Sequence, residues 1–150
     1  MNVLLDLLDE AFDKRSWHGP NLRGSIRGVT AKQAAWRPGP DRHNIWELTL
    51  HAAYWKYVVR RRLTSAKQSE KRGSFVLPGS NFFVRPIDDT EAAWKADIHI
   101  LAAEHRKLRA VVAQLAAPNR ADAHMIRGVA AHDLYHAGQI RLLRRLCQTK

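Results

Sequence analysis

The sequence predicts an all-α fold, a bundle of four main helices that forms one domain over residues 1–150. In four long segments, apolar residues recur every three or four positions, which is typical of amphipathic helices. No segment alternates apolar and polar residues as a half-buried β-strand would. A chain of 150 residues is also long enough to bury one sizeable core, so we expect a single domain.

The first long helix is predicted over residues 2–15. Its apolar face comprises Leu4, Leu5, Leu8, Ala11 and Phe12, and its polar face comprises Asp6, Asp9, Glu10 and Asp13. Short extra helices are expected next. Pro20 fits the first turn of one that runs to Gly28. Thr30 and Gln33 have capping-box spacing at the start of another.

Three more long helices are predicted. The second covers residues 44–63, with Asn44 as its cap and an inward stripe of Leu48, His51, Trp55 and Val58. The third follows Asp88, Asp89 and Thr90, any of which could cap it, with Asp88 and Glu91 in capping-box spacing. It ends near residue 116. The fourth starts within residues 122–125 and ends near residue 147.

A long connection, residues 64–88, separates the second and third long helices. Its first half is polar and fits a disordered linker, whereas its second half places aromatic residues around a Pro-Gly turn. Connections of this length are uncommon inside compact domains and are often functional. We therefore expect the aromatic half to cover one end of the bundle.

The formal net charge of +11 raises the question of an anionic partner such as nucleic acid. The basic residues are scattered along the chain, however. No helix-turn-helix, RRM or zinc-finger motif accompanies them. We therefore favour a solvated basic surface and keep a basic nucleic-acid-binding bundle as an alternative function.

The expected location is the cytoplasm, with no membrane association. No apolar run reaches the ~18 to 20 residues that a membrane-spanning helix needs. The first fifteen residues lack the basic region and cleavage site of a signal peptide. The single cysteine, Cys147, excludes an internal disulfide and a Cys-rich zinc site. A reducing compartment is the default for such a chain.

Two histidines four residues apart, His132 and His136, are the strongest candidates for a functional site. They share one helix face with Val129, Ile140 and Leu143, so both should point inward. His51 lies on the apolar stripe of another long helix. Neutral imidazole is the commonest metal ligand. Three inward histidines from two helices therefore predict one divalent metal ion, with a fourth position open to water.

The segment HDLYH, residues 132–136, also resembles the H-E-x-x-H motif of zinc proteases. Aspartate replaces the catalytic glutamate of that motif. No glutamate or histidine follows His136 to supply a downstream third ligand. We therefore reject a protease.

Four further residues are candidates for the surroundings of the site. Glu47 can accept the second N–H of His51, or it can cap its own helix. Tyr54 and Trp55, one turn after His51, can line a substrate cavity. His18 can approach the site from a helix junction, although a capping or surface role explains it better.

The other histidines fall at helix ends or on faces shared with charge, so we interpret them as structural or solvated: His43, His99, His105 and His124. Asp133 lies about 100° round its helix from His132, and its role stays open.

At these residues the sequence resembles the DinB-like (DinB/YfiT) superfamily of metal-dependent enzymes. The likeness covers most of the chain and includes WHGP, IWELTLHAAYWKYVVRRRL, LPGSNFF, TEAAWKADIHILAAEHRKL and GVAAHDLYHAGQI. It implies an up-down-down-up four-helix bundle with a three-histidine site for a divalent ion, often zinc or nickel. The ligands carried over by motif are His51, His132 and His136, and a homodimer is implied.

The resemblance also implies a class of function. The superfamily includes transferases and isomerases that use the thiols bacillithiol or mycothiol. We therefore expect a metalloenzyme of the thiol-dependent transferase or hydrolase type, which acts on a small-molecule substrate. The open metal position would hold water or a substrate thiolate. Imidazole ligands leave iron, manganese and copper as alternatives to zinc and nickel. A bundle whose metal is purely structural is the other alternative.

Overall fold

The computed structural model describes residues 2–64 and 74–148, and all regular structure within these ranges is helical. The six helices are α1 (Val3–Phe12), α2 (Leu22–Ile26), α3 (Ala31–Ala35), α4 (Ile45–Thr64), α5 (Glu91–Gln114) and α6 (Arg120–Gln148). The predicted all-α class is confirmed, with two short helices after the first long one. The polar half of the 64–88 connection lies mostly outside the described residues.

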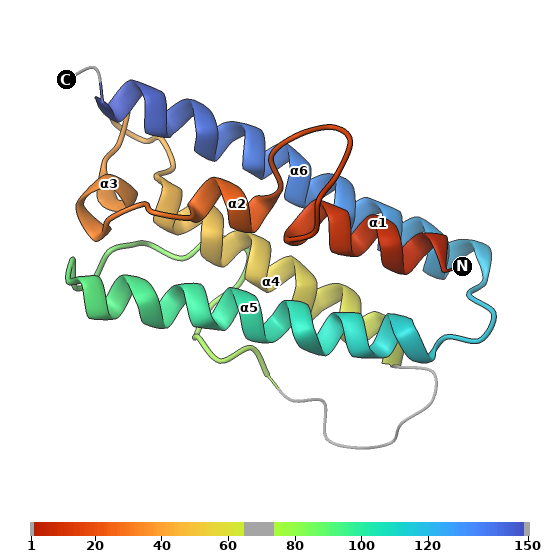
Figure 1. Cartoon of the computed structure of the whole chain (residues 1–150). Coiled ribbons are helices and arrows are strands. Elements are labelled where there is room, and N and C mark those ends of the chain that lie inside the picture. The colour runs from red at the N-terminus through yellow and green to blue at the C-terminus, as the bar shows by residue number, and fades with distance from the viewer. Residues whose placement is uncertain (1, 65–73, 149–150) are drawn as a thin grey trace.

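The four long helices form an elongated bundle (Figure 1). The order of colours shows that α4 and α5 run in one direction and that α1 and α6 run in the opposite one, as an up-down-down-up bundle requires. Helix α4 packs against both α5 and α6, and α1 and α2 pack on α6. This arrangement lays α4 alongside α6, the two helices that carry the three candidate histidines.

Side-chain caps start most of the helices where the sequence predicts. Thr30 and Gln33 form the expected capping box at α3. Asn44 Oδ1 accepts a hydrogen bond of 2.8 Å from the Glu47 N–H and so caps α4. The capping box predicted for α5 is wrong. Thr90 caps that helix, and the Glu91 carboxylate instead accepts a 2.7 Å hydrogen bond from the backbone of α3.

Two helix boundaries also differ from the prediction. Helix α1 ends at Phe12, before the predicted residue 15. The predicted polar face of α1 also differs at one residue. Asp9 is buried there and forms a two-point ion pair with Arg109 of α5, at 2.7 and 2.9 Å. Helix α6 begins at Arg120, since the side chain of Asn119 caps it by accepting from the Asp122 N–H at 2.9 Å.

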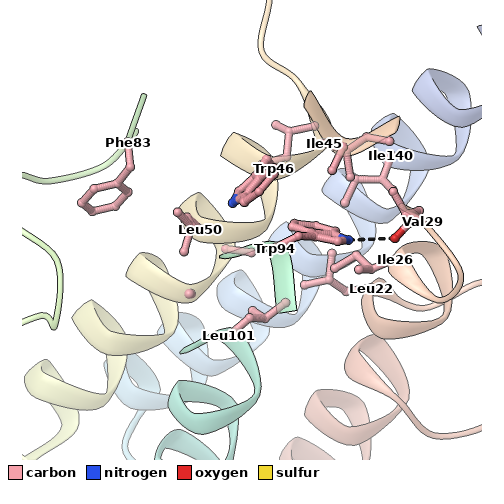
Figure 2. Packing of buried hydrophobic residues seen from close by; sticks show 14 of the residues in the cluster. Leu22, Ile26, Val29, Ile45, Trp46, Leu50, Phe83, Trp94, Leu101 and Ile140 are labelled. Atoms are coloured by element: carbon pink, nitrogen blue, oxygen red, sulfur yellow. Dashed lines mark hydrogen bonds between the residues drawn. The ribbon is translucent and has the colours of Figure 1, made fainter. Parts of the chain in front are cut away.

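The larger core cluster centres on two fully buried tryptophans, Trp46 of α4 and Trp94 of α5, whose ring centroids lie 5.1 Å apart (Figure 2). Each indole N–H has a partner. Trp94 donates to the backbone carbonyl of Val29 at 2.7 Å, and Trp46 donates to Asp97 at 2.7 Å. These bonds satisfy the only polar atom of each large ring, which removes the cost of burying it. The bond to Val29 also attaches the segment before α3 to the bundle.

The aromatic half of the long connection packs on α4. Phe75 and Phe83 are buried, and their rings contact Tyr54 at centroid distances of 5.5 and 5.9 Å. The aromatic half therefore covers the side of α4 around Tyr54, in the middle of that helix, and not one end of the bundle as predicted. Among the described residues, no helix is both long and apolar enough to cross a membrane.

His105 of α5 is buried at 3 % exposure, and its ring stacks on Phe12 at 3.7 Å. The alternative that it is solvated is therefore wrong. Its Nδ1 atom has no hydrogen-bond partner among the described residues. Burial and the nearby charges of Lys56 and Arg109 lower the pKa of the imidazole to about 2. His105 is therefore neutral in the folded chain, while it charges near pH 6.5 in the unfolded chain.

We predict that His105→Phe flattens the pH dependence of stability. Below pH 6.5 the unfolded chain binds a proton at His105 that the folded chain does not, so stability falls as the pH falls. Between pH 6.5 and 5.0 the wild-type protein should lose about 1.5 kcal/mol through this group, and the variant should not. Urea unfolding at both pH values, with chelator present, measures the difference. His99→Phe, at an exposed site on the same helix, should keep the wild-type slope.

Candidate metal centre

The three predicted histidines meet between α4 and α6. The Nε2 atom of His132 lies 3.0 Å from Nε2 of His51 and 3.0 Å from Nε2 of His136. One ligand atom from each residue lies within 4.8 Å of the others. In a tetrahedral site with metal–nitrogen distances of 2.0–2.1 Å, ligand atoms are about 3.3 Å apart. Two of the three separations are thus close to this value, and the donor set can hold a single ion.

The opposite ring nitrogens fix the orientation of two of the imidazoles. His51 Nδ1 lies 2.9 Å from the backbone carbonyl of Asn81, and His136 Nδ1 lies 2.6 Å from Gln139 Oε1. An oxygen acceptor requires the proton to be on Nδ1, so in the neutral rings Nε2 carries a free lone pair. Such hydrogen bonds on the far side of a ligating histidine orient the ring and raise its basicity.

Burial keeps all three imidazoles neutral. It lowers the pKa of His51, and it lowers the pKa of His132 to about 3, with further lowering from His136 and His51. It also lowers the pKa of His136 to about 4, although the hydrogen bond to Gln139 acts in the opposite direction. Neutral imidazole is the form that binds metals.

The proton count of the cluster also favours a cation. With Nδ1 of His51 and Nδ1 of His136 protonated, only His132 has a proton to place between the three Nε2 atoms. One proton cannot satisfy two contacts of 3.0 Å that lie on either side of the same atom. At least one lone pair would then be left without a donor in a buried site, which is unfavourable. A single metal ion would accept all three.

The part of the chain that carries this geometry matches a known protein family. A family model described as the DinB superfamily matches residues 16–140, which include all three histidines. The chain belongs to the DinB superfamily. No curated protein and no solved structure matches it.

Beside the triad, residues 81–82 of the segment that leads to α5 supply a wall. Asn81 adopts a left-handed conformation (φ 64°), which asparagine tolerates better than most residues. The ring of Phe82 stacks between two imidazoles, at 3.9 Å from His51 and 3.8 Å from His43. His43, expected to be structural or solvated, thus contacts the wall of the site through Phe82. Sequence reasoning missed Asn81 and Phe82.

Glu47 has neither of its predicted roles. It does not contact His51, whose Nδ1 bonds to Asn81, and the cap of α4 is Asn44. Its buried carboxylate accepts from Arg37 at 2.6 and 2.9 Å and from the Arg85 N–H at 3.1 Å. Burial alone would raise the pKa of Glu47, but these bonds and a contact to His43 hold it at about 2. Glu47 therefore ties residue 85, four residues after Asn81, to the start of α4.

A cavity of about 550 Å³ opens over the triad. Apolar side chains form much of its wall, namely those of Pro38, Leu48, Phe82, Leu142 and Leu143. Its polar lining besides the triad comes from Arg42, His43, Tyr135 and Gln139. No carboxylate lines the cavity. Its volume is within the range of small-molecule sites.

The other predicted site residues lie apart from this cavity. Trp55 is close to the triad, with its ring centroid 6.2 Å from that of His132, but it lines a second, smaller cavity. Tyr54 contacts Phe75 and Phe83 and lines neither. His18 is exposed in the turn between α1 and α2 and also lines neither cavity.

A buried ion pair lies next to the triad, and sequence reasoning left it open. Asp133 and Lys56 are fully buried and form a short hydrogen-bonded pair between α6 and α4. Burial raises the pKa of Asp133 to about 6, although the charge of Lys56 opposes this. The signal in the sequence was a lysine between two apolar stretches of α4, AAYW and YVV. The pair fixes α6 against α4 beside His132.

Proposed function

We propose that His51, His132 and His136 bind one divalent metal ion and that the protein is an enzyme acting on a small molecule. The observation that carries the proposal is the convergence of one ring nitrogen from each of the three histidines within 4.8 Å. Zinc or nickel is proposed first, and iron, manganese and copper are alternatives. Three protein ligands leave a position open, which is the usual arrangement of a catalytic site.

The lining of the cavity supports a role in catalysis. A divalent ion bound there would act as a Lewis acid on whatever occupies the open position. The ring of Phe82 covers one face of His51, and Leu143 adds an apolar wall to the same cavity. Arg42 offers a cation to an anionic group of a substrate. The hydroxyl oxygen of Tyr135 accepts from Gln139 Nε2 at 3.2 Å, so its O–H is free to donate a proton into the cavity.

We propose a thiol-dependent transfer as the reaction, with a low-molecular-weight thiol as one substrate, and hydrolysis as the alternative. This step rests on the likeness to the superfamily. The same likeness supports a homodimer, and the single cysteine supports a cytoplasmic location.

Metal titration and a thiol assay test the proposal. Protein purified without a histidine tag, stripped with chelator and titrated with Zn²⁺ or Ni²⁺, should bind about one ion per chain. The loaded protein should accelerate the reaction of a thiol with an electrophile such as 1-chloro-2,4-dinitrobenzene, and the stripped protein should not. Absence of binding would refute the metal site. Binding that raises the melting temperature without any activity on thiols or esters would favour a structural metal.

We predict that Glu47→Gln weakens both the fold and the metal site. Loss of the charged hydrogen bonds to Arg37 and Arg85 should lower the free energy of unfolding by about 2 kcal/mol. The freed backbone around Asn81 should hold His51 less firmly, and metal affinity should fall by up to about tenfold. Glu104→Gln is the matched control, since Glu104 is equally buried and pairs with Arg60 and Lys107 on α4 and α5. It should lose stability but keep the wild-type metal affinity in calorimetric titration.

A further inference from the structure

A second cavity, of about 320 Å³, lies between α4 and α6 on the other side of His132. We refer to it as the Trp55 groove. His132 lines both this groove and the larger cavity, so the triad borders two cavities. The ring of Trp55 forms the wall nearest the triad, and its indole N–H donates to Asn81 Oδ1 at 3.1 Å. The indole is thus held in place by the same residue that orients His51.

The walls of the groove are apolar. They comprise Trp55 and Val59 from α4 and Met125 and Val129 from α6. Val59 and Val129 are buried at its base, with exposures of 6 % and 3 %. A flat indole, two branched side chains and an adaptable methionine suit an aromatic or branched aliphatic group.

Gly128 keeps the groove open. It lies inside α6, where glycine is unfavourable for the helix, and its φ is not in the left-handed region that would require glycine. A Cβ atom built at this position would meet nothing within 4 Å. Packing therefore does not exclude a larger residue. The absence of a side chain at Gly128 leaves space in the groove.

The far end of the groove is cationic. Because α4 and α6 are antiparallel and Trp55 lies beside His132, the groove runs from the triad towards Arg62 and His124. Trp55 and Arg62 are two helical turns apart, or about 10 Å along the axis. Arg62 is exposed and forms no ion pair with a described residue. No carboxylate lines the groove.

We propose that the Trp55 groove binds a small organic anion, with an aromatic or branched apolar body against Trp55 and its anionic group at Arg62. The size of the groove, its apolar walls and its single cationic end together define this class of ligand. The other end of such a molecule lies at His132. The proposal concerns binding alone and does not depend on metal at the triad.

A site-resolved titration tests it. The probe is 2-naphthoate, a flat apolar anion about 10 Å long, added to isotope-labelled, chelator-treated protein and followed by amide NMR. Chelator prevents the carboxylate from binding a metal at the triad. Saturable shifts are expected at Gly128 and Val129 and at the indole N–H of Trp55. Shifts confined to Gln139 and Leu142 would mean that the larger cavity is the site, and they would overturn the proposal, as would no shift at about 10 mM.

Two variants sharpen the test. Gly128→Leu should fill the groove and weaken 2-naphthoate binding at least about tenfold. Gly138→Leu is the matched control, because Gly138 lies in the same helix with nothing within 4 Å of its Cβ position and lines neither cavity. Both changes favour the helix, so both variants should fold. Equal binding by the two variants would contradict the proposal.

The charge of the ligand is tested separately. Arg62→Gln should weaken 2-naphthoate about three- to fivefold, the effect of an exposed ion pair, and should leave the neutral 2-naphthamide unchanged. Arg106→Gln, which removes an exposed charge on α5, should affect neither ligand. An equal loss for both ligands on Arg62→Gln would mean that the guanidinium does not select an anion, and this part of the proposal would be wrong.

Discussion

His132→Ala is expected to leave the protein almost free of divalent metal. His132 is the central ligand, because its Nε2 atom lies 3.0 Å from those of both His51 and His136, which are joined only through it. Loss of an outer hydrogen bond to a ligating histidine costs about 10–100-fold in metal affinity, so loss of the central ligand should cost more than about 100-fold. Elemental analysis of tag-free protein and calorimetric titration with Zn²⁺ measure the change.

His99→Ala controls for metal bound to surface histidines. His99 is exposed on α5 and lies outside the triad. This variant should keep the wild-type metal content. The melting temperature gives an independent readout, since a ligand that binds only the folded state stabilises it. Chelator should therefore lower the melting temperature of wild-type protein and leave that of His132→Ala unchanged. Equal metal content in wild type and His132→Ala would show that the triad is not the site.

Periodicity was enough to predict the histidine triad. His51 and His132 each lie on the apolar stripe of a long helix, and helices with such stripes pack against each other. The stripe on α4 was only partly right. Leu48 and His51 are buried, whereas Trp55 and Val58 are half-buried and Lys56 faces inward. The three histidines converge as predicted because their convergence needed only the two helix faces and no detail of the side chains between them.

The contacts around the triad could not be predicted from the sequence. Asn81 holds His51 through its backbone carbonyl, and every residue has one. Glu47 meets Arg85, 38 residues away, only because the intervening segment folds back on α4. Such contacts depend on how an irregular segment is placed, and its residues follow no period that a sequence pattern could reveal.

Breaking the buried pair of Lys56 and Asp133 is expected to have the largest effect on stability. Lys56→Met or Asp133→Leu alone removes one charge and leaves the other fully buried, which should cost about 3–5 kcal/mol. Leucine has the same branched shape as aspartate, and methionine approximates the lysine chain, so packing changes little. Urea unfolding at pH 7 measures the loss. Lys107→Met removes an exposed lysine from its pair with Glu104, which keeps Arg60 as a partner, and should cost less than about 1 kcal/mol.

The double variant, Lys56→Met with Asp133→Leu, separates the worth of the pair from the penalty of an unpaired charge. Replacement of both partners by apolar residues of similar shape is often neutral or stabilising. The double variant should therefore recover most of the stability that either single variant loses. If the double variant loses as much stability as the two single variants together, the two charges do not stabilise each other and the prediction is wrong. If the double variant is stable but binds metal more weakly, the ion pair serves chiefly to hold His132 in register with His51. In that case stability and site geometry are separate consequences of the same two residues.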